Sequence, residues 1–295
     1  MVTAYFCRRW GGRVSRLGAA WLAGLVWLAA AARAQPVPPV TIPHSEHHVI
    51  QSKVAGHAYD LYVHLPAGYA AATATTKYPV LYVVDGDNDF APTLEYLGLL
   101  MAEYHIPEPL VVAIGDGGPI GSPGNKRTRD FTPTPTAAQP ESGGAPAFLE
   151  FIEQELLPFV ESTYRADPAQ RSYYGYSLGG LLGTYILFKK PALFQNMLLG
   201  SPALGYDNEY IFAVEQAYQA AHRELPVHVF LEVGALEPPS QQAPYQRLVQ
   251  LLQARHYARL DLHSVVVEHA THLTGKPDTM LKALGWAYTK PHITF

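Results

Sequence analysis

The chain has 295 residues, of which 48% are hydrophobic and 16% charged, so it holds enough apolar material for the core of one α/β domain. The first 34 residues carry five arginines and no acid, so their removal changes the net charge from −4 to −9, which argues against nucleic acid or an anionic membrane as a partner. Cys7 is the only cysteine, and the rest of the chain therefore has no disulfide, cysteine nucleophile or Cys-based zinc site.

Residues 1–34 have the layout of a secretory signal peptide. Four arginines form a basic segment, residues 17–32 form an uncharged apolar run, and a small-x-small site precedes Gln35. The apolar run is short for a membrane span. We expect cleavage after Ala34 and export to the periplasm or the cell exterior, by the general or the twin-arginine route. An uncleaved membrane anchor is the alternative.

Residues 35–47 are rich in proline and predict an extended linker, followed by a single domain over residues 48–295. Strand patterns cover residues 49–54, 59–66, 78–86, 108–116, 171–177, 196–202, 227–234 and 260–267, and helical patterns cover residues 91–105, 147–164, 178–190 and 276–288. This alternation predicts an α/β fold with a mainly parallel central sheet and helices on both faces; the first two strands form an antiparallel pair. Such sheets place their chemistry at the carboxyl ends of the strands.

The segment Gly175-Tyr176-Ser177-Leu178-Gly179 lies between a predicted strand and a predicted helix, and it has the G-x-S-x-G pattern of a nucleophile elbow. The sharp turn points the serine Oγ out of the sheet and leaves backbone N–H groups at the helix start to face an oxyanion. The sequence therefore predicts Ser177 as a nucleophile. A glycine-rich turn with an inert serine is the alternative.

A serine hydroxyl needs a base to remove its proton, and the base needs an acid to orient it. After a nucleophile elbow the acid and the histidine follow in that order along the chain. Glu237 follows the strand 227–234, and His272 follows the strand 260–267, so we expect these two residues to complete a triad. Asp207, one strand earlier, stays open as the acid, and His269 stays open as the base.

The predicted reaction also needs backbone donors for the oxyanion. The N–H of Leu178 is one, and the N–H groups of Gly86 or Asp87, after the strand 78–86, supply the second. No metal ion and no organic cofactor is expected.

Taken together, several segments resemble the putative-esterase branch of the α/β-hydrolases, which includes siderophore esterases, S-formylglutathione hydrolase, feruloyl esterases and mycolyltransferases. The matching segments are YPVLYVVDGD (78–87), RTRDFTPT (127–134), YYGYSLGGLLG (173–183), GSPALGYDN (200–208), VGALE (233–237) and THLTGKPDTMLKALGWAY (271–288). The resemblance implies the α/β-hydrolase fold and the triad roles of Ser177, Glu237 and His272. Close members often carry Trp where this chain has Gly205-Tyr206, so the pocket wall differs.

The resemblance also implies that Arg127 lines the substrate pocket, and we expect Tyr176 to contact the substrate as well. Asp130 lies near two arginines, Arg127 and Arg129, and it can neutralise only one of them. We expect the free guanidinium to bind a carboxylate or catecholate-like oxygen. An Arg–Asp pair that only fastens the loop is the alternative.

These features predict a serine hydrolase that cleaves a small-molecule carboxylic ester through an acyl-enzyme. The resemblance favours siderophore-like or aryl esters. Acyl transfer to an acceptor other than water, and a secreted binding protein that has lost catalysis, are the alternatives. Neither nucleic acid nor, after signal cleavage, a membrane is an expected partner, and the sequence leaves the oligomeric state open.

Overall fold

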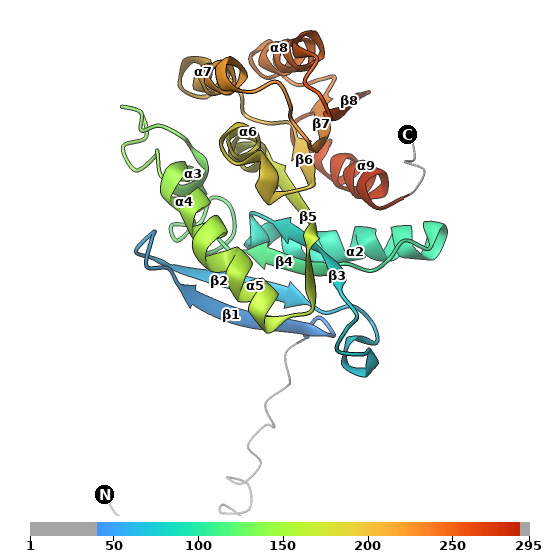
Figure 1. The fold of residues 1–295 in the computed structure, drawn as a ribbon. Coiled ribbons are helices and arrows are strands. Elements are labelled where there is room, and N and C mark those ends of the chain that lie inside the picture. Colours follow the sequence, from blue (N-terminus) through green and yellow to red (C-terminus); the bar gives the residue numbers. More distant parts are fainter. Residues whose placement is uncertain (1–39, 290–295) are drawn as a thin grey trace, which may run out of the picture. The chain divides into compact units, whose positions relative to one another are not determined.

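The computed structural model describes residues 40–289, so the predicted signal peptide lies outside the described residues. Its centre is an eight-stranded sheet in the order β1-β2-β4-β3-β5-β6-β7-β8 (Figure 1). The strands are β1 (Ser45–Gln51), β2 (Ala58–His64), β3 (Tyr78–Val83), β4 (Leu110–Ile114), β5 (Ala166–Tyr176), β6 (Asn196–Gly200), β7 (His228–Gly234) and β8 (Asp261–Val267). β1 pairs antiparallel with β2, and β2 pairs antiparallel with β4, whereas the other pairings are parallel. The predicted mainly parallel sheet is confirmed.

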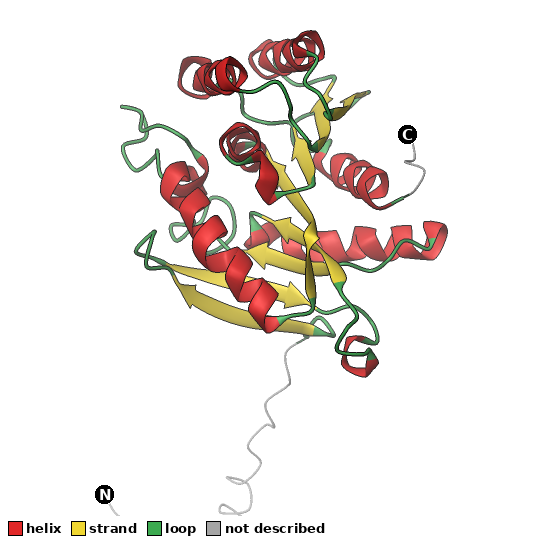
Figure 2. Cartoon of the chain, viewed as in Figure 1, coloured by secondary structure: helices red, strands yellow, loops and turns green. Residues whose placement is uncertain are grey.

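Helices cover both faces of the sheet (Figures 1 and 2). Two helices pack together on one face, α2 (Gly86–Tyr104) and α9 (Lys276–Tyr288). The helices associated with the other face are α3 (Arg127–Phe131), α4 (Ala145–Phe151), α5 (Leu157–Thr163), α6 (Leu178–Lys189), α7 (Tyr206–Ala221) and α8 (Pro239–Arg255). Successive residues of a strand point to opposite faces, so Tyr173 is buried on the α6 side and Tyr174 on the α9 side. A strand buried on both faces explains the continuous apolar runs in the sequence.

Several element boundaries differ from those predicted. The first strand begins at Ser45, inside the segment expected to be linker, and α2 begins at Gly86, so that Pro92 lies within the helix. The helix expected over residues 147–164 is divided by a π-helical segment, Ile152–Leu156, after which Pro158 occupies the first turn of α5. Proline cannot donate to the preceding turn, and a π-helical segment is one way for a helix to accommodate it.

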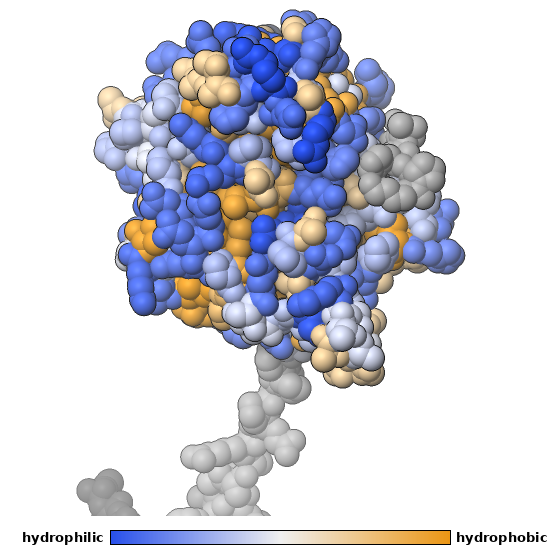
Figure 3. Space-filling model, in the orientation of Figure 1, coloured by the Kyte–Doolittle hydropathy of each residue, from blue (hydrophilic) through white to orange (hydrophobic). Residues whose placement is uncertain are grey.

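The surface on the face drawn in Figure 3 is mainly hydrophilic, with hydrophobic residues in small, separate patches. Among residues 40–289 no helix is both long and apolar enough to cross a membrane.

Candidate active site

Ser177 lies in the turn between β5 and α6, as the elbow pattern predicts. Its backbone, with φ 59° and ψ −115°, occupies a region that is unfavourable for residues other than glycine. The turn is held by the Ser177 N–H, which donates to the Gly200 carbonyl at 2.9 Å. Strand and helix also approach closely, because a Cβ at Gly175 would lie 2.5 Å from the carbonyl oxygen of Gly179. A side chain at position 175 would therefore displace the turn.

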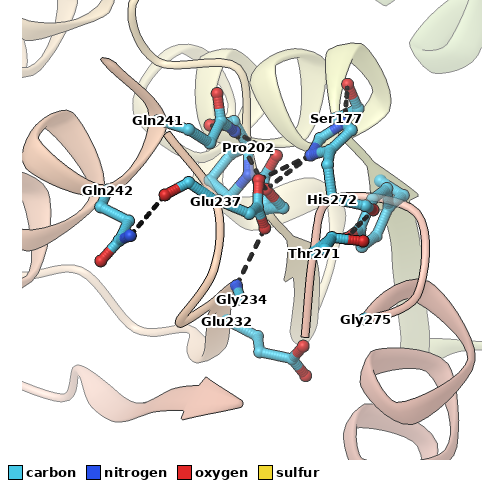
Figure 4. Close-up of polar contacts among 12 residues, drawn as sticks. Ser177, Pro202, Glu232, Gly234, Glu237, Gln241, Gln242, Thr271, His272 and Gly275 are labelled. Carbon is cyan, nitrogen blue, oxygen red and sulfur yellow. Dashed lines mark hydrogen bonds and ion pairs between the residues drawn. The ribbon is translucent and has the colours of Figure 1, made fainter. Parts of the chain in front are cut away.

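A chain of hydrogen bonds joins Ser177 to a histidine and a carboxylate (Figure 4). His272 Nε2 lies 3.0 Å from Ser177 Oγ, and His272 Nδ1 lies 2.7 Å from Glu237 Oε2. Glu237 comes from the loop between β7 and α8, and His272 comes from the loop between β8 and α9. These loops are connected directly, since the N–H of Leu236 donates to the carbonyl of Ala270 at 2.9 Å.

The surroundings of Glu237 favour its ionised form. Burial raises the pKa of this carboxyl, but hydrogen bonds from His272, from the Gly234 N–H at 2.9 Å and from the Ser201 hydroxyl at 2.7 Å lower it below its ordinary value. The carboxylate is thus charged and held in one orientation, as a group that orients an imidazole must be.

Ser201 is a residue that the sequence reasoning missed. Its hydroxyl lies between the acid and the base, 2.7 Å from Glu237 Oε2 and 3.1 Å from His272 Nδ1. The Gln241 side-chain amide donates to the Ser201 carbonyl at 2.8 Å and contacts its Oγ at 3.0 Å. One signal was available, because Ser201 lies at the carboxyl end of the predicted strand 196–202, at the edge of the sheet where functional residues gather.

The alternative acid and base lie elsewhere. Asp207 occupies the first turn of α7 with φ 46°, and its carboxylate accepts a hydrogen bond from Thr134 Oγ1 at 2.6 Å. His269 is exposed, with φ 60°, and no hydrogen bond among the described residues joins it to Ser177. The structure therefore brings Glu237 and His272 to Ser177.

The expected oxyanion donors lie at the starts of two helices. Leu178 is the first residue of α6, and Gly86 and Asp87 are the first two residues of α2. The first N–H groups of a helix have no acceptor within it, so they are available to an anion. The Asp87 carboxylate accepts from Tyr62 Oη at 2.7 Å and also from two N–H groups of the loop after β4, which holds the start of α2 against that loop.

The expectation of a free guanidinium near Asp130 is wrong, because each arginine has its own carboxylate. Arg127 pairs with Asp85, with Nε–Oδ1 and Nη2–Oδ2 distances of 2.6 and 2.9 Å. Arg129 pairs with Asp130 through two contacts of 2.8 Å. The sequence reasoning considered only the nearest carboxylate and missed Asp85, which is distant along the chain.

The surroundings of Tyr176 do not support the expected contact with substrate. This side chain is buried, and its hydroxyl donates to the His272 carbonyl at 2.7 Å. The ring also lies beside the imidazole, with 5.2 Å between the centroids. Tyr176 therefore supports the loop that carries His272.

Among residues 40–289 no group of three or more His, Cys, Asp or Glu side chains is arranged to hold a metal ion. A cavity of about 580 Å³ opens at the amino ends of the strands, between residues such as Pro79, Ser172 and Asn196. It lies at the opposite end of the sheet from Ser177, so the hydrogen-bonded residues, and not this cavity, mark the candidate active site.

Comparison with known proteins gives a consistent set of relatives. The profile of the putative esterase family matches residues 52–276. The ferri-bacillibactin esterase of Bacillus subtilis is 29% identical over 215 residues, which cover 67% of this chain and 72% of that protein. The siderophore triacetylfusarinine C esterase of Aspergillus fumigatus is 31% identical over 187 residues, which cover 61% of this chain and 63% of that protein.

Solved structures include similar folds. The BES protein of Bacillus cereus has a TM-score of 0.76 at 26% identity, over 87% of this chain and 99% of that chain. The siderophore hydrolase EstB of Aspergillus nidulans has a TM-score of 0.72 at 22% identity, over 88% and 100%. At that identity the second likeness concerns the fold alone.

Proposed function

The chain belongs to the putative esterase family of carboxylic ester hydrolases, and from that premise we propose that it is a serine esterase with Ser177 as nucleophile, His272 as base and Glu237 as the orienting acid. The observation that carries the proposal is the continuous hydrogen-bonded chain from Ser177 Oγ through both ring nitrogens of His272 to Glu237. A serine hydroxyl becomes an effective nucleophile in such a chain.

In the first step Ser177 Oγ attacks the ester carbonyl while His272 Nε2 takes the serine proton. The carbonyl oxygen becomes an oxyanion, which accepts hydrogen bonds from the N–H of Leu178 and from the start of α2 at Gly86 or Asp87. His272 then donates its proton to the departing alcohol, leaving an acyl-serine. Water, activated by His272, hydrolyses the acyl-serine and restores the hydroxyl.

For the substrate we propose a siderophore-like or aryl ester. The names of the two related esterases support this class. The site is also open, because the His272 side chain is 36% exposed, which suits a bulky ester. Leu236 and Leu273 adjoin Glu237 and His272 in sequence and are 60% and 79% exposed. We propose that they offer apolar contact to an aryl or acyl group of the substrate. We further propose export, on the pattern of residues 1–34.

The test is an activity screen of the purified chain and its Ser177→Ala variant on p-nitrophenyl acetate, a catecholate siderophore lactone, a feruloyl ester and a short acyl thioester. The variant should lose about 10⁴–10⁶-fold in kcat with its fold intact. A fluorophosphonate should label Ser177 in the unmodified chain. A variant that keeps more than a tenth of the activity, or a label elsewhere, removes Ser177 from its role. Products esterified to an added alcohol would indicate acyl transfer, and an inactive, unlabelled chain would indicate a binding protein.

A further inference from the structure

The Arg127 side chain connects two turns that each carry an oxyanion donor of the proposed reaction. It forms two hydrogen bonds to the Asp85 carboxylate, and Nη2 also lies 3.4 Å from the carbonyl oxygen of Tyr176. Asp85 directly precedes Gly86, at the start of α2, and Tyr176 directly precedes Ser177, at the start of the elbow. Along the chain the first pair of partners is separated by 42 positions and the second by 49.

The two turns lie close together, since a Cβ at Gly179 would be 3.5 Å from Asp85 Oδ2, and both have unfavourable backbone conformations. Asp85 has φ 57° and Ser177 has φ 59°, and positive φ values are unfavourable for residues with a side chain. A Cβ at Gly86 would lie 2.7 Å from the carbonyl carbon of Ile114, so this turn is also pressed against the end of β4. Such conformations persist only where the surroundings hold them.

The ion pair that joins the turns is largely removed from water. The Asp85 and Arg127 side chains are 1% and 12% exposed. Asp116 lies in the same cluster, and both its carboxylate oxygens lack a hydrogen-bond partner among the described residues. Burial, reinforced by the charge of Asp85, raises the pKa of Asp116 well above its ordinary range. The ionised form of Asp116 is therefore disfavoured, whereas Asp85 is the carboxylate that is hydrogen-bonded to Arg127.

We propose that Arg127 is a positioning residue, which fixes the N–H of Gly86 or Asp87 relative to the N–H of Leu178 by tying the Asp85 turn to the nucleophile elbow. This inference rests on the proposed esterase function and deepens it. Oxyanion donors act in the transition state more than in the bound ester, so their misplacement lowers kcat and leaves KM nearly unchanged. A substrate-binding arginine behaves differently, because its loss raises KM for the esters whose oxygen it binds.

The experiment compares Arg127→Gln with unmodified enzyme on a small neutral ester, p-nitrophenyl acetate, and on a feruloyl ester. We expect kcat to fall by about 10–10³-fold on both, with KM changed by less than about threefold. Affinity for phenylboronic acid should fall in parallel, since its tetrahedral serine adduct places an oxygen in the oxyanion site. Asp85→Asn should give a similar loss in kcat. The loss in the double variant should be much smaller than the product of the fold losses in the two single variants.

The matched control is Arg171→Gln, which breaks another partly buried arginine–carboxylate pair, with Glu161, in the middle of β5 and away from the elbow. It should lower thermal stability without the loss in kcat or boronate affinity. If Arg127→Gln does not fold, Arg127→Lys, which keeps the charge but not the two-pronged contact, replaces it with the same expected signature.

An unchanged kcat, or a KM rise confined to the feruloyl ester, would overturn the positioning role while the enzyme stays an esterase. Unmodified enzyme that neither hydrolyses esters nor reacts with a fluorophosphonate would overturn the esterase function, and the positioning role with it.

Discussion

Nδ1 of His272 lies 2.7 Å from Oε2 of Glu237, although the two residues are 35 positions apart and lie in different loops. Asp207, the other candidate acid, is bonded instead to Thr134. We therefore expect Glu237→Gln to lower kcat by more than about 10²-fold, because the imidazole loses its charge partner and its held tautomer. Steady-state kinetics on p-nitrophenyl acetate measure this, with Asp207→Asn as the control. If Asp207→Asn lost most of its kcat and Glu237→Gln kept nearly all of it, Asp207 would be the acid instead.

The two histidines of the loop after β8 should differ in the same assay. His272→Ala should abolish activity, since no other described side chain is hydrogen-bonded to Ser177 Oγ. His269→Ala should retain it, because that side chain is exposed and has no hydrogen bond to the serine. Loss of fluorophosphonate labelling in His272→Ala checks that the serine itself has lost its activation. An equally inactive His269→Ala would count against this base.

We expect Ser201 to affect catalysis by holding Glu237, and not by binding the substrate. Ser201→Ala removes one of the hydrogen bonds that hold Glu237 ionised and oriented, so kcat should fall by about 10-fold with KM unchanged. Ser240→Ala, at an exposed position nearby, is the control. A selective rise in KM would make Ser201 a substrate contact.

Glu232 should make stability depend on pH. Burial raises the pKa of this carboxyl to about 8, from 4.5 in the unfolded chain. The folded state then keeps a proton that the unfolded state releases, so the contribution of Glu232 to stability is fully present below pH 4.5 and is lost as the pH rises from 4.5 to 8. Glu232→Gln cannot lose a proton. The melting temperature of this variant minus that of the unmodified protein should therefore increase as the pH rises from 5 to 8. Exposed Glu268→Gln is the control, and a constant difference across this range would contradict the prediction.

The N-terminal pattern predicts a mature chain that begins at Gln35. Mass spectrometry of protein recovered from the periplasm or the medium should find this terminus, since the small-x-small site ends at Ala34. Replacement of Ala32 and Ala34 by bulky residues should block processing and serves as the control. Full-length chain in the membrane fraction would support the anchor instead.

Local patterns were enough to predict the fold class and the elbow. A strand buried on both faces needs a continuous apolar run such as residues 78–86, and a strained turn between strand and helix needs small neighbours such as Gly175 and Gly179. These requirements act between residues close in the sequence. Ser177, the candidate carboxylates and the candidate histidines each follow a strand pattern in the sequence. Their order along the chain could therefore be compared with the order expected after a nucleophile elbow.

The contacts between loops were decided by the tertiary structure. Glu237 and Asp207 both follow strands in the sequence, and only the course of each loop brings one carboxylate to His272. The partner of Arg127 is Asp85, 42 positions away, and not the nearby Asp130, because β3 and β4 are neighbours in the sheet and the segment after β4 brings the start of α3 to the turn that follows β3. Loop conformation depends on which distant surfaces it packs against, so sequence patterns locate these side chains at one edge of the sheet but do not pair them.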